Sequence, residues 1–167
     1  PFNKNYQDAT ELFSEAIEID KKHADALYGM ALALSNGFDA KSIELAKEAL
    51  AADPSLVEAQ ELLAQLALED VNFKKAVEEA DKALKMSPEA MNAMAIRASV
   101  EVLEDRSPDE WFKKIAAINP RYGQAYAIVA HHLVLNRRYD DGIAYYRKAL
   151  ELDPEHLEAR SQLGINL

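Results

Sequence analysis

The sequence predicts an all-α protein built as a solenoid of repeated helix pairs. Five segments have similar sequences when they are aligned on their last alanine, and they begin 33, 34, 32 and 34 residues apart. This period is the length of one helix-turn-helix unit in a helical solenoid. Composition agrees, because Ala, Leu, Glu and Lys dominate while glycine and proline are scarce. The segments are SEAIEIDKKHADA from residue 14, KEALAADPSLVEA from 47, DKALKMSPEAMNA from 81, KKIAAINPRYGQA from 113 and RKALELDPEHLEA from 147.

Each unit is predicted to contain a helix, a short turn, a second helix and a turn with proline. Proline ends the preceding helix because it restricts the residue before it. In the unit from 57 to 88, apolar residues recur three and four apart, which places one stripe on each helix. The chain is thus predicted to be one domain, residues 1–167, of about ten antiparallel helices. Its predicted parts are a half repeat at 5–21, full repeats at 22–54, 55–88, 89–120 and 121–154, and a half repeat at 155–167.

These units resemble the tetratricopeptide repeat (TPR) family, and the resemblance covers essentially the whole chain. The family pattern has a Leu and a small residue in its first helix, a small residue and an aromatic in its second, and the turn proline. It implies a right-handed TPR superhelix, a solenoid with four full helix pairs and a half repeat at each end. It does not name a partner. Residues 123–154 carry the pattern best, with Tyr126, Val129, Ala130, Leu133, Tyr139, Gly142, Tyr146, Ala149 and Pro154.

The resemblance also implies a concave groove along the first helices of the pairs. In the family this groove is lined chiefly by the second, fifth, ninth and twelfth positions of that helix. We therefore expect a protein or peptide segment to bind there. The candidate groove residues are Asp25, Tyr28, Leu32, Glu58, Glu61, Gln65, Leu68, Asn92, Ser99, Val102, Gln124, His131 and Val134.

Charge along this groove is uneven, as it is along the chain. Residues 1–85 carry 9 lysines against 17 acidic residues, whereas residues 86–167 carry 10 basic against 12 acidic residues. The acidic first part and the neutral or apolar later part predict a partner peptide that is basic near one end and apolar further along. The Lys and Asn with which family members hold the carboxylate of chaperone tails are missing, which argues against that partner class. Tyr28 and Leu32, or Glu61 and Gln65, stand in those positions.

Several other functions are disfavoured by the residues present. A net charge of −10 argues against nucleic acid as a partner. The sequence holds no cysteine, no apolar run of transmembrane length and no phosphate-binding or protease motif, so we expect no membrane span, no cofactor and no enzyme activity. The adjacent His131 and His132 point about 100° apart on a helix, so no metal site is predicted. We expect a soluble protein of the cytoplasm or periplasm.

The unit from 91 to 120 departs most from the family pattern, since it is two residues short. Ser107, Pro108 and Glu110 are predicted to form a capping box that starts its second helix. Arg97 and Glu101 lie four apart on one face of a helix, so they are predicted to form an ion pair with each other, shielded between neighbouring helices. The alternative is that Arg97 is free to bind a carboxylate of a ligand.

Both ends resemble cut repeats. The chain begins as a second helix and ends as a first helix, so we expect a piece of a longer protein. Leu163, Ile165 and Leu167 are predicted to leave an apolar face open, through which the solenoid could self-associate.

Three functions stay open at this point. The first is a peptide-binding module that uses the groove. The second is a structural spacer or assembly element that works through its ends and its convex face. The third is an accessory segment of a bacterial multidomain enzyme, because AINPRYGQAY and RRYDDGIAYYRKALELDP are similar to repeat regions in proteins that carry a separate peptidase-like domain.

Overall fold

The computed structural model describes residues 2–19, 23–37 and 39–164, which form ten α-helices and no strand. The predicted all-α fold is confirmed. No helix of this described part of the chain is long and apolar enough to cross a bilayer. The helices are α1 (Phe2–Ile19), α2 (Ala24–Leu34), α3 (Asp39–Ala52), α4 (Val57–Glu69), α5 (Phe73–Met86), α6 (Met91–Leu103), α7 (Asp109–Ile118), α8 (Gly123–Leu135), α9 (Tyr139–Leu152) and α10 (Leu157–Gln162).

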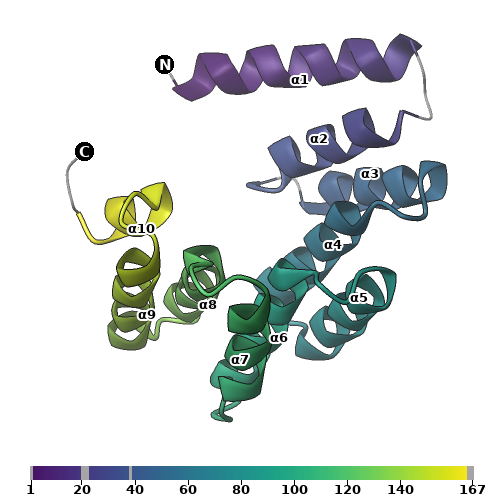
Figure 1. The fold of residues 1–167 in the computed structure, drawn as a ribbon. Helices are drawn as coiled ribbons and strands as arrows, with labels where there is room; N and C mark the ends of the chain where they lie inside the picture. The colour runs from purple at the N-terminus through teal and green to yellow at the C-terminus, as the bar shows by residue number, and fades with distance from the viewer. Residues whose placement is uncertain (1, 20–22, 38, 165–167) are drawn as a thin grey trace.

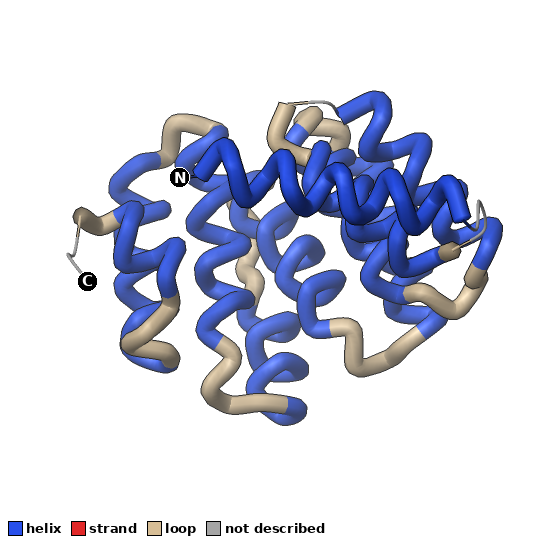
Figure 2. Tube along the Cα trace, turned by 90° about the horizontal axis from the view of Figure 1, so that it is seen from above, coloured by secondary structure: helices blue, strands red, loops and turns tan. Residues whose placement is uncertain are grey.

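The helices are arranged as antiparallel pairs that follow one another around an arc. Figure 1 shows this arc running from α1 at the top, through α4 and α6, to α10 on the left. Seen from above, in Figure 2, short loops join successive helices. We call α2, α4, α6, α8 and α10 the inner helices, because the first four contact one another along the arc and α10 continues the series at its C-terminal end (Figure 1). The outer helices are α1, α3, α5, α7 and α9.

Fully buried alanines recur where neighbouring helices meet. Ala46 and Ala49 of α3 and Ala59 of α4 are fully buried in one cluster with Leu27. The next cluster repeats this arrangement around the buried alanines of α4, α5 and α6. A side chain of one carbon lets two helix axes approach closely, so the larger residues of the stripe can fill the remaining space. The core is therefore continuous from repeat to repeat.

The turn between the two helices of a pair is built the same way three times. Val71, Asp105 and Arg137 each have a left-handed backbone, with φ of 56°, 56° and 62°. The next amide donates to a carbonyl five residues back: Asn72 N to Ala67 O at 2.9 Å, and likewise after the other two. This is the hydrogen bond that closes a helix C-terminus when the following residue adopts φ > 0. Because no glycine occupies these positions, the sequence pattern did not reveal the turn.

The polar residues of the short repeat do not pair as predicted. Arg97 binds Asp81 on α5 and lies over the Trp111 ring, with its guanidinium carbon 4.8 Å from the ring centre. Glu101 instead binds Arg106 in the turn after α6. The predicted Arg97–Glu101 pair is wrong because both side chains reach partners outside their own helix.

The predicted capping box at the start of α7 is also only partly formed. Ser107 Oγ accepts a hydrogen bond from the Asp109 amide at 3.2 Å, but the N-cap position is Pro108. Glu110 binds Lys113 at 2.9 Å. The helix therefore begins one residue later than predicted. Of the expected apolar C-terminal face, Ile165 and Leu167 lie outside the described residues.

Lowering the pH from 4.5 toward 2 is expected to remove the stability that Glu79 contributes. This α5 side chain is 5% exposed, and it binds Lys75 at 2.6 Å, Lys82 at 2.9 Å and the Gln60 amide. Burial alone would raise the pKa of Glu79, but the hydrogen bonds from the lysines and the amide outweigh it and bring the pKa to about 2. The unfolded chain therefore takes up this proton first as the pH falls.

Urea unfolding of the parent and of Glu79→Gln at pH 7, 4.5, 3 and 2 checks this expectation. At pH 7 the variant is expected to be less stable by about 1–3 kcal/mol, and the difference is expected to shrink below pH 4.5. A difference that stays constant down to pH 2 would contradict the assigned role of the Glu79 charge.

Candidate functional site: the inner groove

A small hollow lies where four inner helices meet. Its volume is about 140 Å³, and it combines carboxylates, amides and apolar side chains. Six of the predicted groove residues line it, namely Tyr28, Leu32, Glu58, Glu61, Gln65 and Asn92. The other lining residues are Leu62, Ile96 and Ile128.

The acidic end of the groove holds two exposed carboxylates. Asp25 and Glu58 each stand at the second position of an inner helix and are exposed. Neither makes a hydrogen bond or ion pair with the described residues. The first turn of a helix favours negative charge, so these acids also stabilise α2 and α4. Burial raises the pKa of the adjacent Tyr28, and the charges of Glu58 and Glu61 raise it further.

Glu61 has a structural role that the sequence did not show. One of its carboxylate oxygens accepts a hydrogen bond from the Ala93 amide at 3.0 Å, in the first turn of α6. Burial raises the pKa of Glu61, and this amide acts in the opposite direction. The side chain thereby satisfies one of the amides that a helix start leaves open. Glu61 lines the groove and also holds α4 and α6 together.

The amides further along the groove are bonded to the next repeat. Asn92 is the second residue of α6, and its Oδ1 accepts a hydrogen bond from Tyr122 Oη at 2.7 Å. Gln124 is the second residue of α8, and its Oε1 lies 2.7 Å from His156 Nε2. Both partners directly precede the next inner helix. These two bonds are equivalent, and we call them the inter-repeat bonds.

His131 lies at the far end of the groove in a polar cluster. Its Nδ1 is 3.5 Å from Glu158 Oε1 on α10, and the same oxygen accepts a hydrogen bond from Tyr146 Oη at 3.0 Å. Bonding to Glu158 raises the pKa of His131, and Glu69 adds to the effect from 4.0 Å. The His131 side chain thus already has polar partners within its own chain.

The two adjacent histidines face different surroundings. His132 is 1% exposed, and burial lowers its pKa to about 3, so it is a neutral core residue. The ring planes of His131 and His132 are 81° apart. In the part of the chain that the structure describes, no three His, Cys, Asp or Glu side chains are grouped to hold a metal ion.

Several predicted lining residues do not reach the groove surface. Leu68, Ser99 and Val102 are at most 8% exposed and pack between helices. The Ser99 hydroxyl donates to the Ala95 carbonyl one turn earlier. Val134 packs in the cluster around Tyr146. Fewer residues are therefore accessible to a ligand in the groove than the second, fifth, ninth and twelfth helix positions imply.

The sequence reasoning missed the apolar floor of the hollow. Leu62, Ile96 and Ile128 are each the sixth residue of an inner helix. The signal was present in the sequence, because an apolar residue recurs at this position in three consecutive repeats. The sixth position therefore adds apolar side chains to the lining of the hollow, of which Leu62 and Ile96 are almost fully buried and Ile128 is half-buried.

An open groove along stacked helix pairs defines a class of protein-interaction module. Family models described as tetratricopeptide repeat match residues 32–90 and 123–156. The chain belongs to the tetratricopeptide repeat family, as the sequence predicted.

Two curated relatives match the chain. The small glutamine-rich tetratricopeptide repeat-containing protein 2 of Mycosarcoma maydis is 28% identical over 108 residues, covering 62% of this chain and 31% of that protein. The DnaJ homolog subfamily C member 7 homolog of Dictyostelium discoideum is 26% identical over 180 aligned positions, covering 96% of this chain and 33% of that protein. The chain thus spans about a third of the length of these relatives.

Solved TPR proteins share the fold. TTC0263, a thermophilic TPR protein of Thermus thermophilus, matches with a TM-score of 0.71 at 21% identity, over 95% of this chain and 89% of that one. MamA matches with a TM-score of 0.63 at 17% identity, over 92% of both chains. YrrB, described as a TPR protein with an unusual peptide-binding site, matches with a TM-score of 0.55 at 15% identity, over 96% and 84%. At these identities the likeness confirms the TPR superhelix.

Proposed function

We propose that this chain binds an extended segment of a partner protein in its inner groove, with a basic side chain at the acidic end and apolar side chains beside it. The observation that carries the proposal is the hollow between the inner helices, where an unpaired carboxylate lies next to apolar side chains. A hollow of about 140 Å³ accommodates one side chain of the partner at a time. An extended peptide that uses several such contacts fits this geometry.

The charge preference follows from Glu58. Its carboxylate is exposed and unpaired among the described residues, and Asp25 stands at the same position one repeat earlier. A Lys or Arg of the partner can pair with Glu58 without displacing an existing bond. The later amides, Asn92 and Gln124, are already bonded, so the charged contact is assigned to the first two repeats.

The apolar preference follows from Leu32 and the floor of the hollow. Leu32 on α2 lines the hollow and is 48% exposed, so a ligand can cover it. The half-buried Ile128 also lines the hollow, together with Leu62 and Ile96, which are only 3% and 2% exposed. Covering this surface releases water and favours binding by roughly 25 cal/mol for each Å² buried.

A peptide-library selection compares the parent with a Glu58→Lys variant. The parent is expected to enrich peptides with Lys or Arg a few residues from an apolar side chain. Their affinity for the variant is expected to fall about tenfold, which corresponds to one unfavourable charge contact of about 1.4 kcal/mol. Glu48→Lys is the matched control, since Glu48 is an exposed acid on the outer helix α3. Glu61 is left unchanged because it also caps α6.

Equal enrichment on the parent and on Glu58→Lys would overturn the groove assignment. The alternatives would then be a structural spacer or assembly element, or an accessory segment of a multidomain enzyme. Sedimentation of the 167-residue chain at several concentrations tests the assembly role separately, because self-association raises the apparent mass with concentration.

A further inference from the structure

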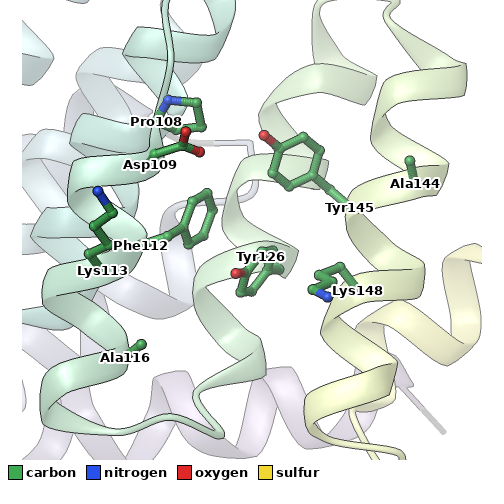
Figure 3. A pocket seen from close by; sticks show the side chains of 9 residues that line it. All are labelled: Pro108, Asp109, Phe112, Lys113, Ala116, Tyr126, Ala144, Tyr145 and Lys148. Atoms are coloured by element: carbon green, nitrogen blue, oxygen red, sulfur yellow. The ribbon is translucent and has the colours of Figure 1, made fainter.

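We propose a second binding site on the outer surface, for a peptide that carries an aromatic side chain flanked by carboxylates. The site is the cleft between α7 and α9, floored by α8, which we call the outer cleft; its volume is about 510 Å³. Figure 3 shows the rings of Phe112, Tyr126 and Tyr145 directed into it from the three helices.

The outer cleft lies beside the short repeat. In the preceding repeats the outer helices α3 and α5 pack against the following inner helices α4 and α6. The equivalent contact of α7 with α8 is much smaller, while α6 and α8 pack closely. The turn through Pro108 starts α7 late, and this residue forms part of the cleft rim. The surface of α8 beside Tyr126 therefore stays open.

The three rings form a continuous platform. Phe112 and Tyr126 stack with their centres 4.1 Å apart and their planes 15° apart. The centre of Tyr145 lies 6.1 Å from Phe112 and 6.2 Å from Tyr126. Two rings in face-to-face contact cannot enclose a cation between them, so the platform does not suit a quaternary ammonium group. It suits an aromatic side chain that lies against offset or edge-on rings.

Two lysines set the charge preference. Lys113 on α7 and Lys148 on α9 line opposite walls, and Asp109 is the one acid among the lining residues. Each lysine pairs with an acid of its own helix at 2.9 Å, and their side chains are 73% and 50% exposed. Exposed pairs of this kind contribute little, so a carboxylate of a ligand can take the place of the helix acid. In a chain of net charge −10, the lining of the outer cleft carries two lysines and one acid, and this balance favours an acidic segment as the occupant.

The volume of the outer cleft matches this occupant. Sites for ligands of drug-like size are typically about 300–1,000 Å³, so 510 Å³ accommodates one aromatic side chain and the backbone around it. The charge preference is opposite to that of the inner groove. The two surfaces therefore select different partner segments, and each can be tested alone.

Fluorescence anisotropy with a defined probe tests the proposal. The probe is a fluorescein-labelled nonapeptide with one central tryptophan between glutamates, and a second peptide carries lysines in place of the glutamates. The 167-residue chain is expected to bind the acidic probe at least tenfold more tightly than the basic one. Lys113→Glu combined with Lys148→Glu is expected to weaken acidic-probe binding at least tenfold. Ala144→Trp, which fills the cleft from an exposed position on α9, is expected to abolish it.

Two controls isolate the outer cleft. Lys41→Glu combined with Lys74→Glu makes the same charge change at exposed positions on α3 and α5, and it is expected to bind the acidic probe as the parent does. Glu58→Lys changes the inner groove and is likewise expected to leave probe binding intact. Thermal melts followed by circular dichroism confirm that each variant is folded.

Four results would overturn the proposal. These are no binding of the acidic probe by the parent, equal binding of the two peptides, unchanged binding by the lysine double variant, and unchanged binding by Ala144→Trp. Sedimentation of the parent and of Ala144→Trp tests whether a second copy of the chain fills the cleft instead. If the parent is a dimer and Ala144→Trp is a monomer, the cleft is a dimer interface and the peptide proposal is wrong.

Discussion

Replacing Tyr146 by alanine is expected to lower the free energy of unfolding by about 3–5 kcal/mol, the range typical of a large aromatic residue lost from a core. The Tyr146 side chain on α9 is 1% exposed and packs against Ala127, Ala130 and Ala159. These neighbours are too small to fill the cavity. The hydroxyl also donates to Glu158, whose carboxylate is half-buried and would lose one hydrogen bond.

Tyr146→Phe separates the two contributions. It keeps the ring and removes the hydroxyl, so we expect a loss of only about 1 kcal/mol. Urea unfolding followed by circular dichroism measures both variants. Amide hydrogen exchange in α10 is expected to accelerate in each, because the ring or its hydroxyl contacts Ala159 and Glu158. If the alanine variant were no less stable than the phenylalanine variant, the packing role of the ring would be disproved.

Gly123→Ala is expected to destabilise the chain by about 1–3 kcal/mol, as over-packing of a tight contact does. A Cβ at this first residue of α8 would lie 2.7 Å from the Ala149 carbonyl oxygen and 3.1 Å from Asp153 Cβ on the α9 side. The carbonyl belongs to the backbone of a helix, so only a shift of α9 as a whole relieves the clash. A melting temperature measured by differential scanning calorimetry is expected to fall.

Gly29→Ala is the comparison for this prediction. A Cβ there would meet the Phe13 ring at 2.4 Å, a side chain of α1 that can turn aside. Within a helix, alanine is also favoured over glycine by about 1 kcal/mol, which offsets part of the crowding. We therefore expect a smaller loss at position 29. An equal or larger loss of stability at position 29 would contradict the expectation that a clash with backbone destabilises the chain more than a clash with a movable side chain.

The fold was predictable because its information is repeated. Five copies at nearly constant spacing define the helix pairs, and the alanine stripe defines which faces meet. The short repeat was visible in the sequence, but its consequence was not. Whether Pro108 and its neighbours would shorten the turn or displace α7 depends on how Trp111, Arg97 and Asp81 pack, which involves three separate helices.

The groove was predicted less well, for a physical reason. Position within a helix fixes the direction of a side chain, but its exposure depends on how closely the next helix approaches. Among the inner helices, α6 and α8 pack most closely, whereas α2 and α4 contact each other at few residues. This closeness buries Ser99 and Val102, whereas Leu32 on α2 stays exposed. The Glu61 cap and the outer cleft likewise depend on contacts between repeats.

The inter-repeat bonds have a mechanical consequence. They connect α6 to the start of α8 through Asn92 and Tyr122, and α8 to the start of α10 through Gln124 and His156. At the equivalent positions α2 has Asp25 and α4 has Glu58, and neither has such a bond in the described part of the chain. Between α4 and α6 the Glu61 carboxylate, bonded to the Ala93 amide, makes a connection instead. The junction between α2 and α4 thus lacks the side-chain bond that the later junctions have, so we expect bending to concentrate there. A change in curvature would therefore open or close the acidic end first, while the spacing of the later repeats stays fixed.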